Sequence, residues 1–212
     1  MTELRLISGA ALAEPAEVEA PAPLRLPPGR HGIPADLVRA HQRLRLLDAA
    51  AAALAEQGYG HITAARITEL AGVSSRTFYQ HFEDLWACLL AAFESEAARL
   101  CQEIEGACPN ARAGIAAGLG FLAAEPDAAR LLSAEPPPQI AALATARRDL
   151  IERLGAMLRA ALRTDATTPL PGLERRLIGA ALALVSTRSA TGDPKRLRDL
   201  EPELTDLLLA SL

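Results

Sequence analysis

Residues 71–82 read AGVSSRTFYQHF, and this stretch decides how the surrounding chain folds. Gly72 permits a sharp turn, because glycine enters the left-handed backbone region without steric cost. Ser74 is a preferred N-cap residue and predicts a short helix over about 75–81. A second short helix is predicted just before the turn, over about 64–71. Two short helices joined by a glycine-containing turn form a helix-turn-helix.

The residues before this motif predict a longer helix that packs against it. From Leu37 onward, apolar residues recur at steps of three and four until Gly58 interrupts them. Thr63 then follows as the N-cap of the helix over 64–71. The recurring apolar positions are Leu44, Leu47, Ala51 and Leu54.

The composition favours an all-α protein of about nine helices. Half of the 212 residues are hydrophobic, and alanine and leucine dominate over β-branched residues. No stretch predicts a convincing strand. Pro202 is expected to kink or divide the last helix near Leu200. The helices predicted after the motif cover about 84–105, 111–124, 127–134, 139–163, 173–190 and 195–210.

Charge is distributed unevenly along a chain whose net charge is -4. Residues 24–82 hold seven arginines against four acidic residues, as well as all four histidines. The flanking segments, 1–23 and 83–212, are both acidic. A locally basic segment in an acidic protein indicates a dedicated anion-binding module.

The cysteines and the N-terminal residues predict a cytoplasmic protein without a cofactor or a metal. Cys88, Cys101 and Cys108 match no zinc-binding spacing and are interpreted as buried or incidental thiols. Residues 1–20 lack the basic start and apolar run of a signal peptide. No uninterrupted apolar run is long enough to span a membrane.

The stretch from Gln42 to Phe93 resembles the DNA-binding domain of the TetR family of bacterial transcriptional regulators. The matching segments are LLDAAAAALAEQGYGHIT, AARITEL, AGVSSRTFYQHF and EDLWACLLAAFE, in this order. LPPGRHG, FLAAEP and RRDLIERLGAMLRAAL are similar to segments of actinobacterial members. The resemblance implies an all-α homodimer whose three N-terminal helices bind a pseudo-palindromic DNA operator. It also implies that a small-molecule effector releases the protein from this operator.

Three segments are expected on this basis. Residues 1–36 form a Pro-rich, disordered extension with a basic arm at 25–32. Residues 37–83 form the helix-turn-helix DNA-binding domain, and residues 84–212 form a helical ligand-binding and dimerisation domain. The resemblance assigns the dimer interface to the last two helices, whose apolar stripes are Leu173, Leu177, Ala181 and Leu184, and Leu197, Leu200, Leu204 and Leu207/Leu208.

The helix over 75–81 carries the predicted base contacts. Arg76 is able to pair with guanine O6 and N7, and Gln80 with adenine N6 and N7, whereas Ser75 and Thr77 reach either a base or a phosphate. Tyr79 and His81 are assigned to phosphates. Phe78 and Phe82 are interpreted as core. The complete predicted DNA-binding set is Thr63, Arg66, Ser74, Ser75, Arg76, Thr77, Tyr79, Gln80 and His81.

Each assignment has an alternative. Arg76 and Gln80 are otherwise solvated side chains, and His81 is otherwise a structural histidine that bonds a neighbouring carbonyl. Arg25, Arg30 and His31 either enter the minor groove as an arm or belong to a plain basic linker.

One position departs from the family pattern. The family usually has a lysine shortly after HF that contacts a phosphate, and this chain has Leu85 there. The positive end of the following helix is expected to compensate in part, because a helix N-terminus favours an anion.

The C-terminal half offers little chemistry. Small residues over 113–124 leave room for an apolar pocket or for close helix packing. Seven polar residues either line a cavity or face water, and most are expected at the surface: Glu94, Arg99, Gln102, Arg130, Ser133, Gln139 and Thr145.

The leading hypothesis is therefore a ligand-responsive repressor. The alternatives are a small-molecule-binding protein or enzyme with a vestigial helix-turn-helix, and a helix-turn-helix used for protein contacts. No nucleophile–base pair, metal cluster or phosphate-binding glycine loop in the sequence supports an enzyme.

Overall fold

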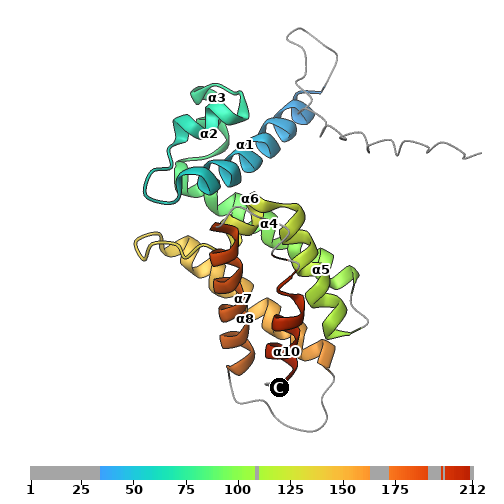
Figure 1. Ribbon diagram of the computed structural model, residues 1–212. Helices are drawn as coiled ribbons and strands as arrows, with labels where there is room; N and C mark the ends of the chain where they lie inside the picture. Colours follow the sequence, from blue (N-terminus) through green and yellow to red (C-terminus); the bar gives the residue numbers. More distant parts are fainter. Residues whose placement is uncertain (1–33, 108–109, 163–171, 191–196, 198, 211–212) are drawn as a thin grey trace, which may run out of the picture. The chain divides into compact units, whose positions relative to one another are not determined.

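The described residues form nine helices and no strand, which confirms the all-α prediction (Figure 1). The computed structural model describes residues 34–107, 110–162, 172–190, 197 and 199–210. The helices are α1 (Ala35–Gln57), α2 (Ala64–Ala71), α3 (Ser75–His81), α4 (Leu85–Gly106), α5 (Ala111–Ala124), α6 (Pro126–Ser133), α7 (Ala141–Leu162), α8 (Leu173–Ala190) and α10 (Glu201–Ala210).

The buried face of α1 differs from the predicted one at a single position. Its centre is the line of Leu46, Ala50 and Ala53, each 0% exposed. Leu44 was predicted in this face but is 57% exposed. Two residues span about 200° of rotation around an α-helix, so Leu44 points away from the line that begins at Leu46. Gly58 ends the helix, with a φ of 67° that glycine adopts without strain.

Proline and asparagine set the boundaries of the later helices. Pro126 opens α6 at its first position, where its missing N–H has no helical partner to lose. The Asn110 side chain accepts a hydrogen bond from the N–H of Ala113 at 2.9 Å and so caps α5. Pro202 is the second residue of α10, which begins at Glu201. The predicted break near Leu200 is therefore confirmed.

One large apolar core runs through these helices, and a smaller cluster of Ala111, Leu158 and Leu177 lies among α5, α7 and α8. Helix α1 packs against α2, α4 and α6, and α4 packs in turn against α5, α6 and α7. Helix α8 lies against α6, α7 and α10. The core includes Phe78 of α3, Leu89 of α4 and Leu131 of α6, all 0% exposed. Helices α2 and α3 are therefore joined through α1 and α4 to the helices that follow.

The described leucines of the last predicted stripe face inward. Leu197, Leu200 and Leu204 are 1%, 1% and 3% exposed within the single chain. These three leucines pack against the core of their own protomer, whereas the side chains of Leu207 and Leu208 lie outside the described residues, so the assignment of this helix to the dimer interface stays a prediction. In α8, Leu177 is also buried, whereas Leu184 is 37% exposed. An outward apolar face is thus available on α8.

Candidate nucleic-acid interface

Two caps and a left-handed glycine fix the geometry of the helix-turn-helix. The Thr63 hydroxyl accepts a hydrogen bond from the N–H of Arg66 at 3.2 Å, and the Ser74 hydroxyl accepts one from the N–H of Thr77 at 3.1 Å. Gly72 ends α2 in the left-handed region, at φ 60° and ψ 39°. All three local predictions are confirmed. These bonds satisfy backbone groups that a helix end otherwise leaves unpaired.

Arg45 of α1 ties the turn to the first helix. Its guanidinium donates hydrogen bonds to the carbonyl of Ala71 and, at 3.4 Å, to the carbonyl of Gly72. The C-terminal end of α2 is thereby anchored by a cation, which also interacts favourably with the helix dipole. Sequence reasoning missed this role, because the two partners lie 26 and 27 residues from Arg45 along the chain.

The aromatic side chains divide between the core and the surface. Phe78 is 0% and Phe82 is 6% exposed, which confirms both as core. Their ring centroids lie 5.8 Å apart, and the guanidinium of Arg43 lies 4.7 Å from the centroid of the Phe82 ring. Tyr79 meets Phe78 edge to face at 5.2 Å but is itself 61% exposed. The buried rings of Phe78 and Phe82 hold one side of α3 against the core, so the other side of the helix faces solvent.

The outward side of α3 carries most of the predicted DNA contacts. Ser75, Arg76, Tyr79 and Gln80 are exposed, and Thr77 is half-buried. Arg76 forms no hydrogen bond or ion pair with any other residue that the structure describes. Its five N–H donors therefore remain available to an external acceptor.

His81 is the last residue of α3, and two arginines of α1, Arg39 and Arg43, lie near it. Burial lowers the pKa of His81 below its ordinary value, and the positive charges of Arg43 and Arg39 lower it further. Arg39 and Arg43 are four residues apart and thus share one face of α1. Neither arginine is among the predicted DNA contacts, although their spacing in the sequence was a usable signal.

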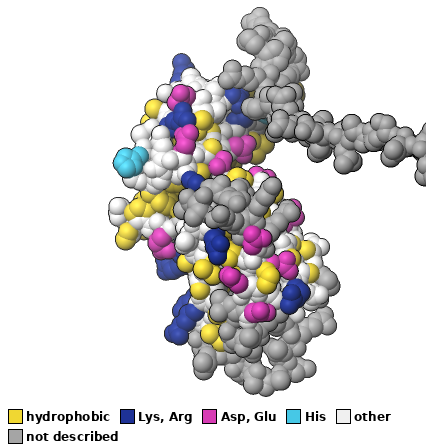
Figure 2. Space-filling view, in the orientation of Figure 1, with side chains coloured by type: hydrophobic (Ala, Val, Ile, Leu, Met, Phe, Trp, Pro, Cys, Tyr) yellow, Lys and Arg dark blue, Asp and Glu magenta, His cyan; other side chains and the backbone are white. Residues whose placement is uncertain are grey.

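Arg66 is paired within the protein. Its guanidinium forms two hydrogen bonds with the Glu56 carboxylate, both at 3.0 Å, and one with Glu69 at 2.8 Å. A phosphate would have to compete with both carboxylates. Figure 2 shows basic and acidic side chains close together in the region where Figure 1 draws α2 and α3.

The start of α4, where partial compensation for Leu85 is expected, carries a capping carboxylate. The Asp84 carboxylate accepts a hydrogen bond from the N–H of Ala87 at 2.7 Å and caps this helix end. A carboxylate thus occupies the position at which a phosphate would meet the positive end of the helix dipole. A phosphate at this terminus would have to compete with the Asp84 carboxylate, and a partial compensation for Leu85 stays a prediction. Arg25, Arg30 and His31 lie outside the described residues.

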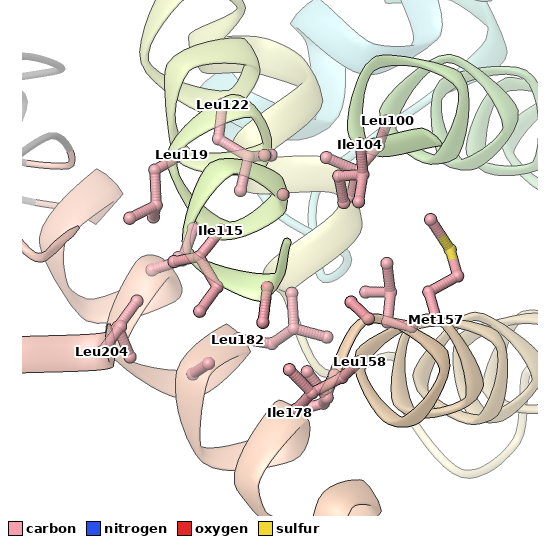
Figure 3. Close-up of a pocket in the computed structure, with 17 residues that line it drawn as sticks. Leu100, Ile104, Ile115, Leu119, Leu122, Met157, Leu158, Ile178, Leu182 and Leu204 are labelled. Atoms are coloured by element: carbon pink, nitrogen blue, oxygen red, sulfur yellow. The ribbon is translucent and has the colours of Figure 1, made fainter. Parts of the chain in front are cut away.

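An apolar cavity of about 110 Å³ lies among α4, α5, α7, α8 and α10 (Figure 3). Leu100 and Ile104 border it from α4, and Leu182 borders it from α8. None of the seven polar candidates of the C-terminal half lines it. The described lining is Leu100, Ile104, Ala111, Gly114, Ile115, Gly118, Leu119, Leu122, Leu154, Met157, Leu158, Ala161, Ile178, Ala181, Leu182, Val185 and Leu204.

Two further classes of site are not found in the described part of the chain. No three His, Cys, Asp or Glu side chains there gather in a way that would hold a metal ion. Among the same residues, no helix combines the length and apolarity needed to cross a bilayer.

Comparisons with known proteins agree with this geometry. Residues 46–92, from α1 into α4, match the family model described as bacterial regulatory proteins, tetR family. No curated protein shows a significant match to the chain.

Solved structures share the fold over most of the chain. A TetR-like transcriptional regulator from Rhodococcus sp. RHA1 is 20% identical, with a TM-score of 0.65 over 87% of this chain and 97% of its own. The fatty acid degradation regulator FadR from Bacillus halodurans is 19% identical, with a TM-score of 0.63 over 79% and 98%. FadR from Bacillus subtilis, in complex with stearoyl-CoA, is 18% identical, with a TM-score of 0.58 over 80% and 98%.

Proposed function

Because its helix-turn-helix domain, residues 46–92, belongs to the tetR family of bacterial regulatory proteins, we propose that this chain is a DNA-binding transcriptional repressor. It binds a pseudo-palindromic operator as a homodimer and is released by a small-molecule effector. The outward side of α3 carries this proposal, since it holds Arg76, which has no partner in the described part of the chain, beside exposed Gln80 on a helix fixed at both ends. A protein that only contacts other proteins has no need of two side chains suited to base edges.

The residues divide by what they contact. Arg76 and Gln80 read base edges in the major groove, and Ser75 and Thr77 reach a base or a phosphate. Tyr79 and His81 bond phosphates beside them, and Arg39 and Arg43 of α1 extend that backbone contact. Thr63 and Ser74 serve first as helix caps. Arg66, held by Glu56 and Glu69, serves to join α1 to α2.

Binding to DNA from the flanking regions of its own gene tests this function. Fluorescence polarisation with labelled fragments should show binding at micromolar dimer or below, and the affinity should fall steeply as salt rises. A matched fragment of shuffled sequence should bind more weakly by a factor of about a thousand or more. Absence of salt-dependent binding to every flanking fragment would refute the proposal.

Operator affinity is expected to rise as the pH falls from about 8 to about 6. A phosphate favours the charged imidazolium, so DNA raises the pKa of His81 from its lowered value in the free protein. Binding therefore takes up a proton. The affinity increases as the pH falls through the bound-state pKa and levels off below the free-state pKa.

Polarisation titrations across this pH range, at constant ionic strength, measure the effect. His81→Gln is the control and should give a flatter profile. If wild type and His81→Gln show the same pH dependence, His81 does not contact the phosphate.

The dimer uses the outward face of α8. Ala180, Ala183, Leu184 and Thr187 are all exposed and follow one another at steps of three, one and three residues, which places them on one face of the helix. Three of them are small, which permits two helices to approach closely. Leu184 adds an apolar side chain that is 37% exposed in the single chain. A twofold axis would place each copy of this face against the other.

Leu184→Glu is expected to convert the dimer into monomers at micromolar concentration. The substitution places two carboxylates in one apolar contact, where neither has a partner. Operator affinity should fall by more than about 100-fold, because one recognition helix then binds alone. Light scattering coupled to size-exclusion chromatography measures the mass. Leu44→Glu, at a 57% exposed position of α1, is the control and should stay dimeric. A dimeric Leu184→Glu would exclude this face.

The effector buries an apolar group in the cavity. All described lining side chains are hydrocarbon or thioether, and a buried polar group left without a hydrogen bond is costly. Bacillus subtilis FadR holds stearoyl-CoA. The cavity here, about 110 Å³, is smaller than the roughly 150 Å³ that admits benzene. A longer apolar group must therefore displace the lining helices, and this displacement shifts the protein toward a state that no longer fits the operator.

A further inference from the structure

Arg130 of α6 joins the C-terminal ends of two helices that belong to different functional parts. Its guanidinium donates one hydrogen bond to the carbonyl of Ala55 in α1 and another, at 3.1 Å, to the carbonyl of Ser189 in α8. Helix α1 ends at Gln57 and α8 at Ala190, so both carbonyls lie in a last helical turn. Such carbonyls lack an intrahelical partner and carry the negative end of the helix dipole.

The guanidinium is committed to this pair of carbonyls. No carboxylate among the described residues forms an ion pair with Arg130, and its side chain is half-buried. The base of the side chain is also fixed. Ala129, Leu131 and Leu132 beside it are each 0% exposed, so α6 cannot shift without disturbing the core. If the C-terminal end of α1 or of α8 moves, its hydrogen bond to Arg130 therefore changes, because α6 itself stays in place.

One of the two helices reaches the apolar cavity. Val185 lines that cavity and is 1% exposed, and Ser189 lies one turn later on the same helix. No residue of α6 lines the cavity. The helices that pack on α1 are α2, α4 and α6. Through α6, Arg130 thus connects a cavity-lining helix to the first helix of the DNA-binding domain.

We propose that Arg130 is a positioning residue that transmits the state of the cavity from α8 to α1. This inference rests on the proposed function for its biological meaning. A displacement of α8 moves the Ser189 carbonyl, and Arg130 then loses or regains its bond to Ala55. The C-terminal turn of α1 gains or loses stability accordingly. A second route runs through α4, which borders both the cavity and α1. The test must separate the two.

A double-mutant cycle on the full-length protein separates them, with amide hydrogen exchange as the readout. Val185→Ala perturbs the cavity from α8, and Arg130→Gln removes the charge and the fork of donors. The relative rate is the amide exchange rate at residues 54–58 divided by the rate at residues 67–71 of α2. This ratio does not change if a substitution destabilises the whole protein uniformly. In the wild-type background, Val185→Ala should raise the relative rate at 54–58 about fivefold, the lower end of typical coupling between sites.

In the Arg130→Gln background the same substitution should change that relative rate by less than about twofold. A merely structural arginine would leave the effect of Val185→Ala unchanged, since the two losses would add. Arg148→Gln is the matched control, because Arg148 donates to a carbonyl of its own helix, that of Ala144 at 3.4 Å. It should preserve the fivefold effect.

Two results would overturn the proposal. One is an equal effect of Val185→Ala in the wild-type and Arg130→Gln backgrounds, which would assign the coupling to α4. The other is no effect of Val185→Ala on residues 54–58 in wild type. The cycle uses no DNA, so its outcome stands apart from the operator-binding test of the proposed function.

Discussion

Phe78→Ala is expected to lower the free energy of unfolding by about 3–5 kcal/mol. Phe78 is 0% exposed and packs its ring against those of Tyr79 and Phe82. Its removal forfeits the burial of a large apolar side chain and leaves a cavity that the surrounding helices fill only in part. Since a domain is stable by only about 5–15 kcal/mol, this loss approaches the limit of folding.

Urea denaturation followed by circular dichroism measures this loss, at fixed protein concentration because mass action would stabilise the proposed dimer. Tyr79→Ala is the matched control, since it removes an aromatic ring from the next position of the same helix. Tyr79 is 61% exposed, so its replacement should change stability by about 0.5 kcal/mol or less. Equal midpoints for Phe78→Ala and wild type would show that the aromatic pair does not hold α3.

The helix-turn-helix could be predicted from sequence because its determinants are local. Thr63 and Ser74 each bond an N–H only three residues away, and Gly72 sets the turn by its own backbone. The predicted bounds of α2, α3 and α5 match the observed ones for the same reason. Pro202 indicated a break near Leu200 within the predicted helix over 195–210, and α10 begins at Glu201.

Predictions that depended on partners distant in sequence were less successful. Leu44 and Leu46 are equally apolar, and only the position of neighbouring helices decides which of them is buried. The stripe of Leu197, Leu200 and Leu204 has the periodicity of any buried helix face, which does not distinguish a protomer core from a dimer interface. The side on which α10 packs is a tertiary property.

The candidate site shows the same division. The outward position of Arg76, Tyr79 and Gln80 followed from the helical period once Phe78 and Phe82 were assigned to the core. The pairing of Arg66 did not, because Glu56 lies ten residues away on another helix. The cavity could not be predicted from the helical period either, because its lining comes from five helices spread over residues 100–204. Small residues over 113–124 indicated room, and Gly114 and Gly118 do border it.

Arg76→Ala is expected to weaken operator binding about 5- to 150-fold for each half-site, which corresponds to about 1–3 kcal/mol. Arg76 is exposed and has no partner among the described residues, so its loss should leave the fold unchanged. Arg76→Lys should recover little of the affinity, because an ammonium lacks the planar fork that meets guanine O6 and N7 together. Arg112→Ala, at an exposed position of α5, is the control and should bind as wild type does.

The affinities for operator DNA and for shuffled DNA together distinguish a base contact of Arg76 from a phosphate contact. A base-reading Arg76 contributes to operator binding but little to binding of shuffled DNA, so its removal should lower the ratio of the two affinities and leave the salt slope nearly unchanged. A phosphate-binding arginine would weaken both DNAs alike and reduce the slope of log affinity against log salt by about 0.9. Polarisation titrations of both fragments at several salt concentrations measure these quantities. Equal losses on the two fragments would move Arg76 to the backbone and leave Gln80 as the base contact of α3.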